Sequence, residues 1–351
     1  MKALVPGGSG FAGRHVVAAL IARGHSVVVG TRGVRWRGIG SGSEAVPRVR
    51  ARFETLTNAA AWEPVLDGIV NCVGVLRERG RETYDRVHHL APAALAAACR
   101  SRRIRRLVHI SALGLTDAAR SRFIRSKLDG ERAILRSGAT ATIVRPSLLD
   151  GEGGFGARWL RSIARWPIHV VPADATGRIA VLQAGDLGAA VAAICEAESA
   201  PPILELGGTR NMTLAQHLAA LRAASGRAPA RCIRVAPLLA RLGSHVCDLL
   251  HFSPFSFGHL ELLRHDNVPS RGALDHPLAA AAELVPLCSC EGELEMDANY
   301  RDAVASPTLS GDQPPPSDRA RSTSAIRASR AAAIRSVSAC RSWRCESRTS
   351  R

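Results

Sequence analysis

The first thirty residues alternate between apolar runs and a glycine-rich turn. Ala3–Val5 is short and apolar, and it ends in Pro6-Gly7-Gly8. Apolar residues then recur at helical spacing through Phe11–Arg23, and Gly24 follows at the position where helices commonly end. Ser26–Val29 is a second apolar, β-branched run. The pattern predicts a strand, a glycine turn, a helix and a second strand, which together begin a βαβ unit.

Strand-like and helix-like patterns keep alternating further along the chain. Further strands are predicted at Val49–Phe53, Gly68–Cys72, Arg105–Ser111, Thr140–Arg145 and Ile203–Leu206. Further helices are predicted at Ala59–Leu66, Thr83–Cys99, Ser121–Arg136, Phe155–Trp166, Ala184–Ala197 and Thr213–Ser225. This alternation is typical of an α/β protein whose parallel sheet is doubly wound through right-handed crossovers.

The glycines that follow the first predicted strand fit a dinucleotide-binding turn. Gly7 lets the chain leave the strand sharply, Gly10 lets the backbone approach a pyrophosphate, and Gly13 lets the helix pack closely on the sheet. Ser9 and Phe11 flank Gly10, where the helix N-terminus presents N–H groups to phosphate. A glycine triplet alone is weak evidence, but its place between a strand and a helix favours a Rossmann fingerprint over a ligand-free turn.

The residue after the second predicted strand indicates which dinucleotide binds. NAD-binding domains place Asp or Glu there, to accept a hydrogen bond from the ribose. Here the strand ends in Thr31-Arg32, and Arg35 and Arg37 follow. A guanidinium matches a 2′-phosphate in bidentate geometry. We therefore predict NADP(H) in preference to NAD(H), the alternative being that Arg32 belongs to a solvated basic loop.

Length, charge and composition indicate how the chain divides into domains. The 351 residues carry a net charge of +17, which favours anionic partners such as nucleotides. After about Pro286 no apolar period survives and Ala, Ser, Arg and Pro dominate. We predict an NAD(P)-binding Rossmann domain over 1–150, a small, partly helical substrate-pocket region of the same extended fold over 151–285, and a disordered basic tail over 286–351.

The remaining composition excludes several classes of protein. The nine cysteines are scattered, without zinc spacing, so we expect reduced thiols and no metal site. The N-terminus lacks the pattern of a signal peptide, and no apolar run approaches the ~18 residues of a membrane span. A nucleic-acid binder is disfavoured because no aromatic residues interleave with the basic tail.

Several motifs then resemble one superfamily, in its order and spacing, over roughly Met1–Leu221. They are GGSGFAG from Gly7, VNCVGVL from Val70, RLVHISALG from Arg106, FIRSK from Phe123, VRPSLLDG from Val144 and AGDLGAAV from Ala184. The chain resembles the short-chain dehydrogenase/reductase superfamily, in its extended or atypical branch. VNCVGVL and Ala91-Pro92 are similar to the nucleotide-binding accessory subunit of respiratory complex I and its bacterial relatives.

The resemblance assigns catalytic positions and shows one departure. In the superfamily a Ser orients the substrate carbonyl, a Tyr moves the proton, and a Lys four residues later holds the nicotinamide ribose; here these positions are Ser111, Phe123 and Lys127. Lys127 is one of only two lysines in the chain, which favours a retained role. Phe123 has no proton to give, and a positioned general acid typically contributes about 10²–10⁴-fold. His88 is the candidate substitute, with a structural role as its alternative.

The resemblance implies further contacts around the dinucleotide. Leu56 meets the adenine, Val73 and Gly74 follow the fourth strand, and Pro146 and Ser147 lie beside the nicotinamide. Asp186 is better explained as a helix N-cap. Past Asp150, the segment Gly151–Gly156, Trp159 and Trp166 either line the substrate pocket or belong to loop and core.

Two functions remain open on this basis. One is a cofactor-bound accessory, assembly or sensing protein of the respiratory or quinone kind, with a membrane-complex partner. The alternative is an active NADP(H)-dependent oxidoreductase or epimerase/dehydratase that uses Ser111 and Lys127 without the tyrosine and acts on an unidentified small molecule. We expect a cytoplasmic protein, peripheral at the inner face of the membrane, without a transmembrane helix.

Overall fold

The computed structural model describes residues 1–33, 38–39, 46–51, 66–250, 255–270 and 278. Predictions that concern Leu56, Arg35, Arg37, most of the helix at Ala59–Leu66 and the tail over 286–351 lie outside these residues. Among the described residues, none of the helices combines the length and the apolar content that crossing a bilayer would need.

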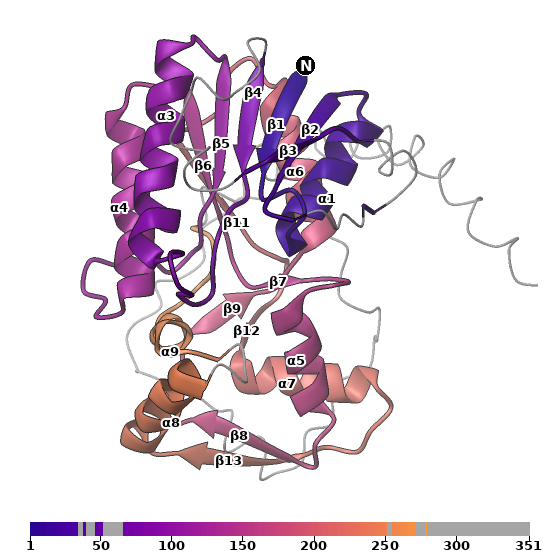
Figure 1. The fold of residues 1–351 in the computed structure, drawn as a ribbon. Coiled ribbons are helices and arrows are strands. Elements are labelled where there is room, and N and C mark those ends of the chain that lie inside the picture. The colour runs from indigo at the N-terminus through magenta and orange to yellow at the C-terminus, as the bar shows by residue number, and fades with distance from the viewer. Residues whose placement is uncertain (34–37, 40–45, 52–65, 251–254, 271–277, 279–351) are drawn as a thin grey trace, which may run out of the picture. The chain divides into compact units, whose positions relative to one another are not determined.

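A seven-stranded parallel sheet forms the core of the described chain (Figure 1). Its strands are β1 (Lys2–Pro6), β2 (Ser26–Thr31), β3 (Arg48–Arg50), β4 (Gly68–Asn71), β5 (Arg106–Ile110), β6 (Ala141–Pro146) and β11 (Ile203–Leu206). They lie in the order β3-β2-β1-β4-β5-β6-β11, and every neighbouring pair is parallel. The first six follow the 3-2-1-4-5-6 order of dinucleotide-binding sheets. The predicted doubly wound Rossmann class is confirmed.

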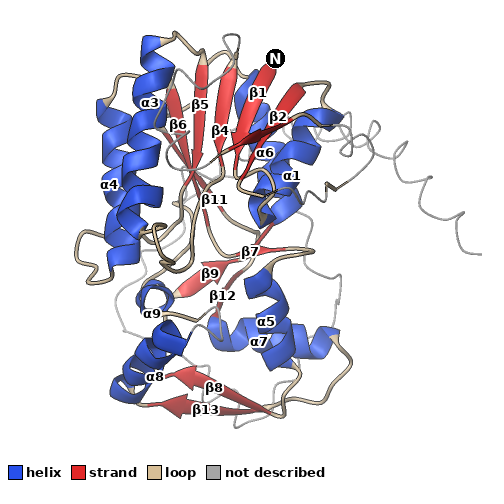
Figure 2. Ribbon diagram, viewed as in Figure 1, coloured by secondary structure: helices blue, strands red, loops and turns tan. Residues whose placement is uncertain are grey.

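Helices cover both faces of this sheet (Figure 2). They are α1 (Phe11–Ala22) and α6 (Ala184–Glu196) on one face, and α3 (Ala91–Ser101) and α4 (Arg122–Arg136) on the other. Successive side chains of β1 point to opposite faces of the sheet. Ala3 and Val5 pack with α1 and α6, while Leu4 packs with α3. Helices α1 and α6 approach so closely that a Cβ on Gly188 would lie 2.6 Å from the carbonyl oxygen of His15.

Residues after 150 contribute to the sheet and also build a smaller region. Its further elements are β7 (Leu149–Asp150), α5 (Phe155–Ala164), β8 (Ile168–Pro172), β9 (Arg178–Ala180), β10 (Leu182–Gln183), β12 (Asn211–Thr213), α7 (Leu214–Ala224), β13 (Arg231–Val235), α8 (Pro237–Leu250) and α9 (Phe257–Leu263). Helices α5 and α7 share a small apolar cluster with β8 that includes Leu160, Val171 and Leu218. The chain returns to the large sheet through β11 and α6, so the two regions share one fold.

One helix departs from its sequence prediction. The pattern predicts a single helix over Thr83–Cys99, but the structure has a π-helical segment, η2 (Asp85–Leu90), ahead of α3. This segment packs tightly on α4, where a Cβ on Gly130 would lie 1.9 Å from the carbonyl oxygen of His88. Hydrogen-bond partners for the His88 ring come from residues 75 and 126. These contacts come from other parts of the fold, so the hydrophobic periodicity of the sequence does not reveal them.

Candidate functional site

The glycine turn after β1 is held by close backbone contacts. Gly7 adopts φ +74, and a Cβ there would lie 2.8 Å from the carbonyl carbon of Cys72 and from the amide nitrogen of Val73. At Gly13, a Cβ would lie 2.2 Å from the carbonyl oxygen of Gly7 and 2.7 Å from the Cα of Gly8. Both positions therefore require glycine, because the atoms in the way belong to the backbone.

Gly10 differs from these two glycines, because only one backbone atom lies close to where its Cβ would be. A Cβ there would meet only the carbonyl oxygen of Gly7, at 3.1 Å. Gly10 is the N-cap of α1, which has no side-chain cap and no acidic residue in its first turn. The helix dipole and the first N–H groups are thus available to an anion. Ser9 extends from the same turn and donates from Oγ to Thr31 Oγ1 at 3.1 Å. The geometry fits a pyrophosphate.

Phe11 borders this turn on the side of the smaller region. Its ring meets the ring of His15 edge-on at 5.7 Å. It also lies against Gly154, where a Cβ would be 2.9 Å from the Phe11 ring. The loop after β7 therefore packs on the glycine turn.

Arg32 follows β2, as predicted, but it has a partner. Its guanidinium forms an ion pair with the Glu82 carboxylate, and 63% of its side chain is exposed. The partner belongs to a turn that closes through a bridge between Arg79 and Glu82. Sequence reasoning missed this acid because it lies fifty positions further along the chain. The pair places one basic and one acidic group beside the end of β2.

Ser111 is the first residue after β5, and its hydroxyl is buried. Its amide donates to the carbonyl of Val144 at 2.8 Å, which fixes its backbone to the next strand. Its Oγ has no hydrogen-bond partner among the described residues. An unsatisfied buried hydroxyl costs about 1–3 kcal/mol, so a bound molecule that completes it would be favoured.

Lys127 lies on α4 with 9% of its surface exposed. Burial lowers the pKa of its ammonium to about 8, and the nearby Glu131 carboxylate opposes that shift. Its Nζ lies 5.6 Å from the centroid of the Phe123 ring, one turn earlier on the same helix. Lys127 and Phe123 thus share a helix face, as the spacing predicts.

An aromatic cluster surrounds Phe123, the residue at which the sequence resemblance predicts a tyrosine. His88 belongs to η2, Tyr84 is the residue before η2, and His259 belongs to α9. Their ring centroids lie 5.5–5.6 Å from that of Phe123. The sequence indicated only His88. Tyr84 and His259 carry no motif, and only the fold brings them here.

Each polar group in this cluster is engaged or poorly suited to proton transfer near neutral pH. His88 Nε2 accepts from the amide of Val75, and its Nδ1 bonds with Ser126 Oγ at 3.1 Å. Burial, together with the Lys127 and His109 charges, holds the His88 pKa well below its usual value. Tyr84 donates to the carbonyl of Leu76, and burial raises its pKa to about 12.

His259 is also neutral at pH 7. Burial lowers its pKa to about 4, although the Asp248 carboxylate acts in the opposite direction. Its Nδ1 lies 2.6 Å from Ser256 Oγ. These contacts are typical of a structural histidine.

Four other predicted residues lie at or just after the ends of β4 and β6. Val73 and Gly74 follow β4 beside the glycine turn; Val73 donates its amide to Asn71 Oδ1, and Gly74 faces His88. Ser147 follows Pro146 at the end of β6, but its hydroxyl donates to the Asn267 carbonyl and accepts from the Ala180 amide. Ser147 thus ties β6 to the C-terminal region.

The structure also shows where three further predicted residues lie, outside the glycine turn. Asp186 lies in the first turn of α6, whose N-cap is Gln183, so the N-cap interpretation was wrong by three positions. Trp159 packs on the cluster between α5 and α7, whereas Trp166 is 61% exposed.

Comparison with known proteins agrees with this geometry. Residues 7–162 match the family described as NAD(P)H-binding. These residues are therefore similar to NAD(P)H-binding domains. The match begins at Gly7 and extends through Ser111 and Lys127 into α5, so it includes the turn, the buried hydroxyl and the buried cation. The sequence resemblance stated above is confirmed.

Curated relatives are similar over part of their length. A ceramide reductase of Caulobacter vibrioides (strain NA1000 / CB15N) is 29% identical over 211 residues, which cover 54% of this chain and 60% of that protein. The mitochondrial NADH dehydrogenase (ubiquinone) 1 alpha subcomplex subunit 9 of Arabidopsis thaliana is 27% identical over 216 residues, covering 59% and 53%. The subunit of the same name from Dictyostelium discoideum is 28% identical over 206 residues, covering 56% of each. The chain thus spans between 53% and 60% of these relatives.

Solved structures share the fold. UDP-glucuronic acid 4-epimerase from Bacillus cereus, solved with UDP-glucuronic acid and NAD, superposes with a TM-score of 0.56 at 16% identity, over 81% of this chain and 97% of that one. MoeE5 in complex with UDP-glucuronic acid and NAD gives 0.57 at 18% identity, over 78% and 91%. At these identities the likeness concerns the fold alone.

Proposed function

We propose that this protein holds NADP(H) as a structural or sensing cofactor and acts as an accessory or assembly protein of a respiratory or quinone-related complex. The observation that carries the proposal is Phe123. An apolar ring stands where the superfamily needs a phenol, and the groups packed around it do not replace the phenol. Named relatives of this chain that are subunits of NADH dehydrogenase support the same role.

The retained features serve binding. The glycine turn would hold the pyrophosphate, and Lys127 would hold the nicotinamide ribose. When bound, the dinucleotide would supply hydride chemistry. Apart from Lys127, which the proposal assigns to the ribose, no group described around Phe123 has a pKa near neutrality. A general acid works best with a pKa near the operating pH, whereas the pKa values of Tyr84 and His259 are about 12 and about 4.

The phosphate preference depends on Arg32. A 2′-phosphate carries more charge than the Glu82 carboxylate and accepts a bidentate guanidinium, so NADPH would draw the exposed Arg32 away from its partner. Were NADH the physiological ligand, Glu82 would instead be the group that accepts from the ribose.

Titration of the purified protein with NADPH and NADH, followed by nicotinamide fluorescence, tests this. We expect NADPH to bind at least tenfold tighter, a gap of about 1.4 kcal/mol. Arg32→Ala should abolish the preference, and Glu82→Gln should tighten NADPH binding. Arg102→Ala is the matched control, because it removes an exposed arginine at the end of α3. Failure of both nucleotides to bind would overturn the proposal.

An active NADP(H)-dependent reductase or epimerase is the second candidate, and Ser111 favours it. Its buried hydroxyl lacks a partner among the described residues, as expected of a group that waits for a substrate carbonyl. A curated relative bears the name ceramide reductase. Steady-state NADPH consumption with quinones, aldehydes and sugar nucleotides distinguishes the two. Turnover that Ser111→Ala removes, with NADPH affinity unchanged, would favour the enzyme.

The NADH dehydrogenase relatives also support a proposal about location. We propose a cytoplasmic protein that associates peripherally with the inner face of the membrane, where a respiratory complex would be its partner. Fractionation of cells that produce the full chain tests this. Recovery of the protein in the membrane fraction, with release by high salt, is expected; recovery entirely in the soluble fraction at low salt would contradict it.

A further inference from the structure

Helix α8 exposes an apolar face. At about 100° per residue, six of its side chains fall within a sector of about 120°: Leu238, Leu239, Leu242, Val246, Leu249 and Leu250. All are at least half exposed, and Leu249 reaches 78%. The opposite side of the helix holds the buried Ala240 and Ser244. Helix α8 thus packs on the protein with one face and presents a continuous leucine-rich face to solvent, which is unusual for a solvated surface.

The neighbouring two-stranded sheet shows the same feature. Its parallel register pairs Ile168 with Arg231 and Val170 with Ile233, so these four side chains share one face. Ile168, Val170 and Ile233 are exposed, whereas the alternate residues of β8 are buried. Strand β13 ends at Val235 and α8 begins at Pro237, so the two apolar surfaces adjoin along the chain. Figure 1 shows α8, β8 and β13 together at the end away from the large sheet.

Charge around this surface is mostly positive, although one of its arginines, Arg161, pairs with Asp150. Residues 155–172 and 226–250, which build this end, contain seven arginines and one acid, Asp248. That acid accepts from the Phe257 amide at 3.0 Å and pairs with Arg77, so it is occupied within the protein. An exposed apolar face rimmed by arginine is complementary to an anionic membrane surface.

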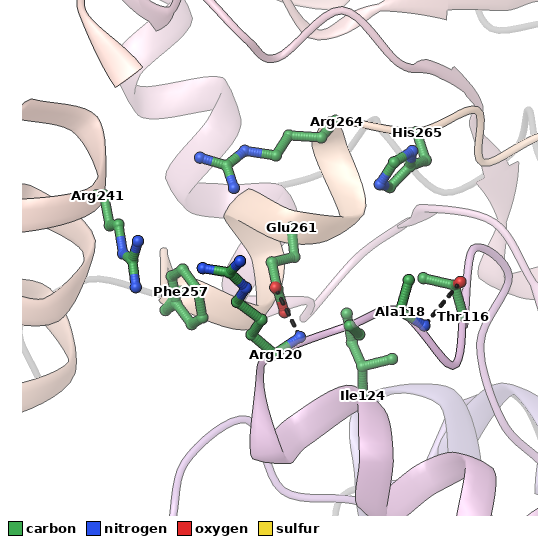
Figure 3. Close-up of a pocket in the computed structure, with 10 residues that line it drawn as sticks. Thr116, Ala118, Arg120, Ile124, Arg241, Phe257, Glu261, Arg264 and His265 are labelled. Atoms are coloured by element: carbon green, nitrogen blue, oxygen red, sulfur yellow. Dashed lines mark hydrogen bonds between the residues drawn. The ribbon is translucent and has the colours of Figure 1, made fainter. Parts of the chain in front are cut away.

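A cavity of about 340 Å³ opens beside α8 (Figure 3). It is lined by side chains from α8, α9 and the loop before α4, among them Arg120, Arg241 and Arg264. Arg264 pairs with Asp174, but no ion pair of the described residues involves Arg120 or Arg241. Arg241 instead lies over the Phe257 ring, with its Cζ 5.4 Å from the centroid.

Among the described residues, the acid that lines this cavity forms no ion pair with these arginines. Glu261 accepts from the backbone amides of Arg120 and Ser121, at 2.9 and 2.7 Å. Phe257 and Glu261 lie on one side of α9, and His259 lies on the other, against Phe123. The cavity therefore belongs to a different face from the aromatic cluster, and it suits a phosphate group.

We propose that this end of the molecule docks on an anionic membrane, with α8 lying in the headgroup region and a lipid phosphate bound by Arg120 and Arg241. At 14 residues, about 21 Å, α8 is too short to span a bilayer but long enough to lie in its interface. The inference deepens the peripheral location proposed above by naming its surface. Membrane docking does not depend on dinucleotide binding, so either proposal can fail while the other stands.

The test uses the full chain in co-sedimentation with vesicles of phosphatidylcholine alone and of phosphatidylcholine mixed with phosphatidylglycerol. We expect at least about tenfold stronger partition onto the anionic vesicles. Leu238→Gln/Leu242→Gln/Leu249→Gln should weaken partition about tenfold. Arg241→Gln should reduce the preference for anionic vesicles about fivefold. Leu135→Gln/Arg136→Gln is the matched control, since both residues are exposed on α4.

Circular dichroism and the midpoint of urea unfolding verify that each variant folds, and Leu249→Gln alone serves if the triple variant does not. Equal or absent binding to the two vesicle types would overturn the proposal. So would binding of glycerol phosphate in calorimetry without vesicle binding, because the cavity would then serve a free phosphate. Conversion of a dimer to a monomer by the triple variant, with vesicle binding unchanged, would assign the face to a second copy instead.

Discussion

Phe123→Tyr places a phenol one helical turn before Lys127, at the position where the sequence resemblance predicts the superfamily's tyrosine. Phe123 itself is 7% exposed. If the missing hydroxyl is what prevents turnover, this single oxygen should create an NADPH-dependent reductase. The outcome distinguishes a catalytic site that lacks only the tyrosine hydroxyl from a site that no longer supports catalysis.

The magnitude follows from the Lys127 cation. Taking the 5.6 Å between Nζ and the ring centroid as the separation, a cation and a phenolate interact by about 3 kcal/mol at an effective dielectric of about 20. That is equivalent to about two pKa units, so the phenol would move from about 10 toward about 8, before burial raises it again. The added hydroxyl costs at most about 1–3 kcal/mol if it finds no partner, which a domain of ordinary stability tolerates.

The assay is initial-rate NADPH oxidation with ketones, aldehydes, quinones and sugar nucleotides. We expect a rise of about 10²–10⁴-fold over wild type with at least one class. Phe123→Leu controls for altered packing, and Phe123→Tyr/Lys127→Met should return the rate to the wild-type level. A tyrosine variant that binds NADPH as tightly as wild type, yet is no faster than Phe123→Leu with every substrate, would refute the reasoning.

Three further predictions concern binding and stability. Lys127 has a pKa of about 8, so its charge is present below pH 8 and is lost above it; NADPH affinity should fall several-fold between about pH 7 and 9 in wild type but stay flat and weak in Lys127→Met, as fluorescence titration would reveal. Gly13→Ala should destabilise the fold by about 1–3 kcal/mol in urea unfolding and weaken NADPH binding, because its Cβ would meet backbone, whereas Gly185→Ala, with open space around it, should do neither. Ser111→Ala should leave the melting temperature unchanged or raise it, since the hydroxyl has no partner among the described residues; a clear fall would mean that the hydroxyl is satisfied.

Much of the dinucleotide site could be predicted from sequence, because its elements are local. The glycine turn lies between a strand and a helix that are contiguous in the chain, so periodicity and three glycines suffice to place it. Phe123 and Lys127 share a helix face through their spacing alone. Ser147 was assigned to the nicotinamide by resemblance, and only its bonds to Asn267 and Ala180 reveal a role in joining β6 to the C-terminal region.

The sequence by itself determined the α/β class and the glycine turn, since each depends on neighbours within one turn or one strand, whereas the phenylalanine at the tyrosine position is a prediction from resemblance. Tertiary structure decided what surrounds these features. It paired Arg32 with an acid fifty residues away, gathered Tyr84 and His259 around Phe123, and left the leucines of α8 exposed. The physical reason is that periodicity reports which side chains share a face, whereas the partner of that face depends on contacts between segments distant in the chain.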